Sequence, residues 1–241
     1  MTKLGLLKQT ALSLSLILLL STSAYCAIVI EDTAIGGNTS TSSTISVTVS
    51  GSNTMMISCI VDETYFGASA VTYNGTSLTR KEYISGGNET AAIWYLINPD
   101  AGTHDLVVTH PGSQSLIAMG MALSGTEQQE PEASENEVAD GITSLATDIT
   151  TVTVNALIVG TTGSNSSSGS FSAVSGQVLQ GQQGAPGGSS FEGVFYTKVT
   201  TTKGANSYTG DKGVTSSNLS NAVVSIAEVQ TAPTGAPPQI W

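Results

Sequence analysis

Charged side chains and histidines are scarce in this chain, and their scarcity excludes several functions. Lysine and arginine number 7 against 18 aspartates and glutamates, which gives a formal net charge of −11. Because binding to a phosphate backbone requires a Lys/Arg surface, nucleic acid is not an expected partner. The two histidines, His104 and His110, lie at opposite ends of one predicted strand, about 20 Å apart at ~3.4 Å per residue. They cannot share a metal ion, and we expect no metal and no cofactor.

Catalytic motifs are missing as well. The chain contains no Gly-x-Ser-x-Gly turn that would present a serine nucleophile. Glycoside hydrolysis needs two carboxyl groups facing each other across a cleft. The candidates, Asp62-Glu63 and Glu82, fall at strand ends, where carboxylates are usually solvated. The sequence therefore predicts that the protein is not an enzyme.

Long hydrophobic runs are limited to one, near the N-terminus. The basic residues Lys3 and Lys8 precede the apolar run Ala11–Leu20, and small residues follow at Ser21–Ala24. This order is typical of a secretory signal peptide, which we place at residues 1–26. An uncleaved anchor is the alternative, although the run is shorter than the ~20 residues that span a bilayer. We expect a secreted protein located at the extracellular surface, with no membrane span after removal of the leader.

The chain has only two cysteines, Cys26 and Cys59. If cleavage follows Ala24, both remain in an oxidising compartment and a disulfide could tie the first strand to the rest of the fold. The alternative is a buried thiol, because Cys59 shares one face of a predicted strand with Ile57 and Val61. We favour the buried thiol, since Cys26 lies next to the cleavage zone.

Alternating apolar and polar residues fill most of the remaining chain. Period-two alternation bounded by turn residues is the signature of β-strands, and Asn74-Gly75 is a strong hairpin signal. Gly36-Gly37-Asn38 is expected to break the first strand. Predicted strands in the first half are Ala27–Thr33, Ser43–Ser50, Met55–Val61, Ala70–Tyr73, Thr76–Glu82, Ala91–Ile97, His104–Thr109 and Ser115–Leu123. The sequence thus predicts an all-β protein with antiparallel sheets.

The second half repeats the first at a constant spacing. Three separated motifs match at an offset of 101 residues, which indicates an internal duplication. We predict pseudo-repeats at 43–125 and 144–230. The matched positions are Met55 with Ala156, Gly75 with Gly176 and Trp94 with Phe195, while Ser115–Leu123 matches Asn221–Val229 after a longer loop.

Two architectures are compatible with this duplication. In the first, residues 27–230 form one jelly-roll-like antiparallel β-sandwich, and the second repeat, which has few large apolar residues, shares the core of the first. In the second, the repeats are two tandem immunoglobulin-like sandwiches, each with its own core. Residues 126–142 are acidic and are expected to form a solvated loop, with a calcium site as the alternative. Residues 231–241 are Pro-rich and are expected to be extended.

The first half resembles an immunoglobulin-like domain. The stretch Met55–Val61 resembles its B strand, with Cys59 at the usual cysteine position, and Asp100–Leu106 resembles its E–F corner. The sequence departs from the pattern where Leu106 replaces the second cysteine, which rules out the usual disulfide within the domain. Residues 27–230 also resemble uncharacterised secreted and phage-associated β-sandwich proteins. That resemblance implies a fold and transfers no site.

Two kinds of function follow from these features. The leading hypothesis is a structural or adhesive subunit that self-associates into a surface appendage, filament or virion-like assembly through apolar chain ends. The alternative is a carbohydrate-binding module in which exposed aromatic rings stack on glycans. Against this alternative, Trp94 could instead be buried between the sheets. The assembly residues are Ile28, Ile30, Ile240 and Trp241, and the sugar-binding residues are Trp94, Tyr65 and Phe66.

Overall fold

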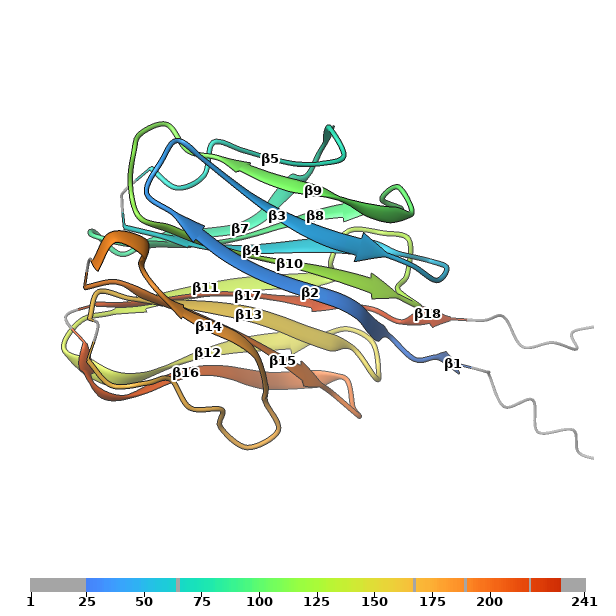
Figure 1. Cartoon of the computed structure of the whole chain (residues 1–241). Helices are drawn as coiled ribbons and strands as arrows, with labels where there is room; N and C mark the ends of the chain where they lie inside the picture. Colours follow the sequence, from blue (N-terminus) through green and yellow to red (C-terminus); the bar gives the residue numbers. More distant parts are fainter. Residues whose placement is uncertain (1–24, 64–65, 167, 189, 217, 231–241) are drawn as a thin grey trace, which may run out of the picture.

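The computed structural model describes residues 25–63, 66–166, 168–188, 190–216 and 218–230. These residues form 18 strands and one short 3-10 helix, Pro186–Gly188, and every strand pairing is antiparallel (Figure 1). The predicted all-β antiparallel sandwich is confirmed. Among the described residues, no helix has the length and apolarity needed to cross a membrane.

The first repeat forms two sheets. Its inner sheet has the strand order β2-β10-β4-β8-β7, with β2 at Val29–Asn38, β4 at Met55–Asp62, β7 at Thr79–Ser85, β8 at Thr90–Ile97 and β10 at Leu116–Ser124. Its outer sheet has the order β3-β9-β5-β6, with β3 at Ser42–Val49, β5 at Ala70–Tyr73, β6 at Thr76–Ser77 and β9 at Gly102–Thr109.

The second repeat also forms an inner and an outer sheet. The inner sheet has the order β11-β17-β13-β15-β14, with β11 at Ala133–Ala139, β13 at Leu157–Ser164, β14 at Val178–Gly184, β15 at Glu192–Val199 and β17 at Leu219–Ile226. The outer sheet pairs β12, Ile142–Thr151, with β16, Gly204–Ser216. A separate short ladder joins β1, Tyr25–Cys26, to β18, Val229–Gln230, so the two described chain ends lie side by side.

The sheets are stacked in four layers (Figure 1), and a hydrophobic core lies between each layer and the next. One core lies between the two sheets of the first repeat, another between the two sheets of the second, and the third between the two inner sheets. Strands β4, β10, β13 and β17 are consequently buried on both faces. Each repeat therefore has its own sheet pair, as in the tandem arrangement, and shares a core with the other, as in the single sandwich.

The two repeats have the same strand order, but their residue offset differs from the predicted one. The pairing of β4 with β8 and of β13 with β15 makes Ile93 equivalent to Phe195, an offset of 102 residues. Ile93 and Phe195 both line the shared middle core, whereas Trp94 lies in the first repeat's own core. The predicted match of Trp94 with Phe195 is therefore wrong by one residue, which places the two rings on opposite faces of their sheets.

Two segments predicted to interrupt the strands are instead part of them. Gly36 and Gly37 lie inside β2, and a Cβ on Gly36 would come within 2.5 Å of Ile45, so this glycine allows close packing. In the acidic segment 126–142, β11 pairs with β17 along the edge of the second inner sheet. Its backbone bonds offset the charge repulsion, and its exposed glutamates suit an edge strand because charges discourage further pairing.

Candidate functional site

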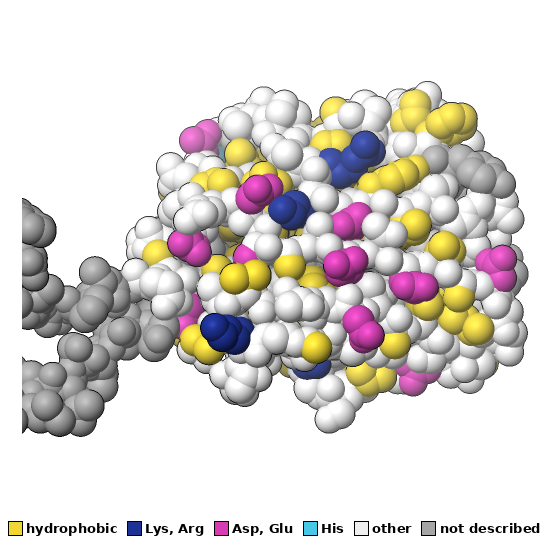
Figure 2. All heavy atoms as spheres, turned by 180° about the vertical axis from the view of Figure 1, so that it is seen from behind, with side chains coloured by type: hydrophobic (Ala, Val, Ile, Leu, Met, Phe, Trp, Pro, Cys, Tyr) yellow, Lys and Arg dark blue, Asp and Glu magenta, His cyan; other side chains and the backbone are white. Residues whose placement is uncertain are grey.

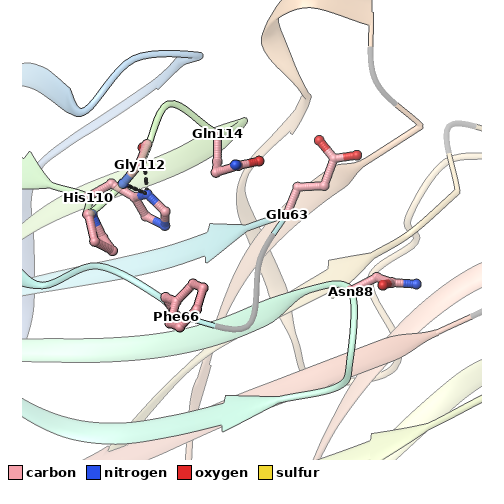
Figure 3. Close-up of a pocket in the computed structure, with 7 residues that line it drawn as sticks. Glu63, Phe66, Asn88, His110, Gly112 and Gln114 are labelled. Atoms are coloured by element: carbon pink, nitrogen blue, oxygen red, sulfur yellow. Dashed lines mark hydrogen bonds between the residues drawn. The ribbon is translucent and has the colours of Figure 1, made fainter.

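Three connections converge at one end of the first repeat and surround a cavity of about 350 Å³, hereafter the loop cavity (Figure 3). They are the β4–β5 loop, the β7–β8 turn and the β9–β10 loop. Their lining residues are Glu63 and Phe66, then Asn88, then His110, Pro111, Gly112 and Gln114. Loops held by a rigid sandwich are common positions for binding sites, because the sheets fix the loop ends while the tips vary.

The wall of the loop cavity combines an exposed ring with polar groups. The Phe66 side chain is 75% exposed, although burial of a phenyl ring is normally favourable. Glu63, Asn88 and Gln114 bring a carboxylate and two amides to the same cavity, so hydrogen-bond donors and acceptors surround an apolar platform. This combination can hold a ligand that has one apolar face and hydroxyl groups on its rim.

His110 also lines the loop cavity, and both of its ring nitrogens face oxygen atoms of the protein. Its Nδ1 lies 2.8 Å from the carbonyl oxygen of Gly112, and its Nε2 lies 3.7 Å from Oδ1 of the fully buried Asp62. The Asp62 carboxylate is the main cause of a raised pKa at His110, because it favours the charged imidazolium. With Nδ1 directed at a carbonyl oxygen and Nε2 at a carboxylate, neither nitrogen is available to take a proton from a ligand. The imidazole therefore stabilises the loop.

The predicted sugar-binding residues are not brought together. Trp94 is only 8% exposed, packs in the core of the first repeat and lies under the guanidinium of Arg80, 5.6 Å from the ring centroid. It therefore cannot stack on a glycan, and the burial interpretation of Trp94 is the one that the structure supports. Tyr65 lies outside the described residues. Phe66 alone stands in the loop cavity with its ring exposed.

Of the four predicted assembly residues, two lie in the described part of the chain. Ile28 and Ile30 are partly buried against the shared middle core, and Ile30 pairs with Leu123 of β10 within its own chain. The first strand is thus already paired along its length and is not free to be donated to a neighbour. Ile240 and Trp241 lie outside the described residues.

The structure also shows the surroundings of Cys59 and of the acidic segment. Cys59 is a free and fully buried thiol at the centre of the shared middle core. The Cys26 side chain lies outside the described residues. Within the described part of the chain, no three His, Cys, Asp or Glu side chains gather as a metal site would require, which includes the described acidic residues of the proposed calcium segment.

Sequence reasoning missed a set of buried polar side chains at this end of the molecule. Glu89, next to Asn88 of the loop cavity, is fully buried and accepts a hydrogen bond from Ser220 of the second repeat. Lys212 and Glu192 form a buried ion pair in the second repeat. The sequence offered one signal for this pair. Lys212 and Glu192 are charged residues that each precede a glycine in a segment otherwise poor in charge.

Comparison with known proteins found no matching family model, no matching curated protein and no matching solved structure. The function of the loop cavity must therefore follow from its own residues and their geometry.

Proposed function

We propose that this protein is an extracellular, non-enzymatic adhesive β-sandwich that binds a glycan in the loop cavity. The observation that carries the proposal is the exposed Phe66 ring in the wall of a cavity that one carboxylate and two amides also line. A sugar ring has an apolar C–H face that packs on an aromatic ring, and hydroxyl groups that reach amides and carboxylates at its rim.

The charge of the protein narrows the ligand class. Glu63 lies in the wall of the cavity, and the chain carries a formal net charge of −11. On the face shown in Figure 2, acidic side chains are spread over a mainly uncharged surface, and the lysines and arginines are isolated from one another. An anionic polysaccharide would be repelled by such a surface. We therefore propose neutral sugars as the ligands.

The test is a glycan array followed by titration calorimetry with the soluble oligosaccharides that bind. Phe66→Ala should weaken binding at least about tenfold, which corresponds to about 1.4 kcal/mol, because the ring supplies the stacking platform. The matched control is Val152→Ala, which changes another exposed apolar residue outside the lining of the cavity and should leave affinity unchanged. Equal affinities of wild type and Phe66→Ala, or no binding to any neutral glycan, would rule the site out.

A second candidate, a self-associating structural subunit, is favoured by one observation. The edge strands β2 and β14 lie next to each other, where Gly181 approaches Ile35, and among the described residues each pairs with a neighbouring strand on one side only. Four large apolar side chains are exposed on these two strands: Val29, Ile35, Val178 and Leu179. Exposed strand edges with apolar side chains are typical sites of association between chains.

The mass of the protein in solution tests this candidate. Light scattering at increasing concentration should show association in the wild type and its loss in Leu179→Lys, which places a charge on the β14 edge. Deleting residues 231–241 tests separately whether the C-terminal tail contributes. A wild type that stays monomeric at high concentration would exclude the assembly function and leave the glycan-binding proposal standing.

A further inference from the structure

A lysine is buried at the loop end of the second repeat. Lys212 is 1% exposed, and its ammonium group directly contacts a carboxylate oxygen of Glu192. The ring of Phe171 covers the pair, with its centroid 4.7 Å from Nζ. Lysine is almost never fully buried unless it has a partner, so this position needs a specific explanation.

A β-bulge brings Lys212 into the interior. The ladder between β12 and β16 shifts register after Ser144 pairs with Asp211, and the next pair is Ile142 with Ser216. Lys212 falls in the extra residues of this bulge, next to Gly213 in the left-handed conformation. Bulges redirect side chains, and this one turns an amine toward the first residue of β15.

The same place in the first repeat also holds a buried basic side chain that faces a carboxylate. The register that pairs β3 with β9 and β12 with β16 makes His110 equivalent to Lys212, again at an offset of 102 residues. His110 faces Asp62 at the end of β4, whereas Lys212 faces Glu192 on the neighbouring strand. The chemical difference is that imidazole forms no lasting amide with a carboxyl group, whereas a primary amine does.

The surroundings of Glu192 favour reaction between the two groups. One carboxylate oxygen accepts a hydrogen bond from Nε2 of Gln182, while the other oxygen meets Nζ of Lys212. Because the two groups touch, a single proton transfer from nitrogen to oxygen yields the amine and the carboxylic acid that condensation to an amide requires. The amine is then a nucleophile in contact with its electrophile, and such positioning gives effective concentrations of about 10⁵ M or more.

We propose that Lys212 and Glu192 form an intramolecular amide cross-link. The Nζ atom attacks Cδ of the protonated Glu192 side chain, and the Cδ–O bond to the oxygen that faces Lys212 breaks. That oxygen leaves as water after it has taken up the protons that nitrogen loses. The remaining oxygen becomes the amide carbonyl and keeps its hydrogen bond from Gln182. The reaction requires no oxidant and no cofactor.

The cross-link would join two layers of the second repeat. Lys212 belongs to β16 of the two-stranded outer sheet, and Glu192 belongs to β15 of the inner sheet. In the described part of the chain, the outer sheet consists of one pair of strands, and it packs on the rest of the molecule mainly through side chains. A covalent tie at its bulge would fix this layer permanently, as a disulfide does in other secreted proteins.

Digestion of the denatured, purified mature protein with trypsin, followed by mass spectrometry, tests the proposal. Trypsin cleaves after unmodified lysine, so an unreacted chain releases a peptide that begins at Gly213. We expect no such peptide from the wild type. Residues 204–241 should stay together and be joined to the peptide 82–198, which contains Glu192, with the loss of one water molecule.

Two variants provide the controls. Lys212→Arg keeps the charge and the trypsin site but cannot form the amide, so it should release the Gly213 peptide and unfold at a lower temperature than the wild type. Glu192→Ala should release it as well. Full release of the Gly213 peptide from the wild type would overturn the proposal. Loss of ammonia with a link to Gln182 would also overturn it, because Gln182 would then be the electrophile.

Discussion

Replacement of Glu89 by glutamine should change how the stability of the protein depends on pH. Glu89 is fully buried between the repeats, and this burial raises its pKa from 4.5 to about 8. The hydrogen bond from Ser220 acts in the opposite direction, and the charge of Asp140 raises the pKa further. The folded state therefore holds a proton that the unfolded chain releases at much lower pH.

The sign and size of the effect follow from this difference. Because the folded pKa lies above the unfolded one, the stabilising contribution is complete below about pH 4.5 and is lost as the pH rises toward about 8. The loss is about 1.4 kcal/mol per pH unit within that window, or about 5 kcal/mol in total. Glutamine has the same shape, can accept the bond from Ser220 and cannot ionise. Glu89→Gln should therefore be similar to the wild type at pH 5 and several kcal/mol more stable at pH 9.

Urea unfolding curves at pH 5 to 9 measure this difference directly. The quantity to compare is the free energy of unfolding of Glu89→Gln minus that of the wild type, since the contributions of other groups cancel. Glu135→Gln, on the exposed face of β11, is the matched control and should give a constant difference. If the difference for Glu89→Gln is also constant across this range, Glu89 is not a buried neutral acid and the reasoning is refuted.

Other substitutions test the packing and the second buried pair. Gly160→Ala should lower stability by at least about 1–3 kcal/mol in the same urea assay, because a Cβ there would lie 2.1 Å from the Tyr208 ring; an unchanged midpoint would contradict this packing. The Cys59 thiol, whose pKa burial raises, should resist thiol reagents until the protein unfolds, and rapid labelling of the native state would show that the middle core opens. His110→Asn should cost most stability below about pH 6.5 and progressively less as the pH rises through the raised pKa of His110, because the imidazolium then loses its charge. A cost that does not vary with pH would mean that the pair with Asp62 is not ionic.

The strands of the first repeat were predictable because their alternation is bounded by turn residues. The hairpin at Asn74-Gly75 is an example, and both residues have positive φ as the turn requires. The residue offset between the repeats was not predictable. Strands such as β4 and β13 are buried on both faces, so they have no polar face to fix the phase of the alternation, and an offset of 101 fits their composition as well as 102 does.

The site was predictable only in part, for different physical reasons. Phe66 could be identified from the sequence as an aromatic residue in a loop. The burial of Trp94 could not, because it depends on a second sheet that packs over β8 and leaves no signal in the sequence of β8 itself. Asn88 and Gln114 are ordinary loop residues until three connections converge. The Lys212–Glu192 pair was out of reach because it depends on a bulge, and the register shift that creates it leaves no period in the sequence.

The packing of the two inner sheets is reciprocal. Strand β7 of the first repeat lies over β11 of the second, and β14, the equivalent of β7, lies over β2, the equivalent of β11. A contact in which each half offers the same patch to the other is the isologous interface of a two-fold homodimer, here contained within one polypeptide. A single repeat expressed by itself would expose the apolar side of its inner sheet, and pairing with a second copy would cover that side again. The chain is thus arranged as a dimer whose subunits have been fused.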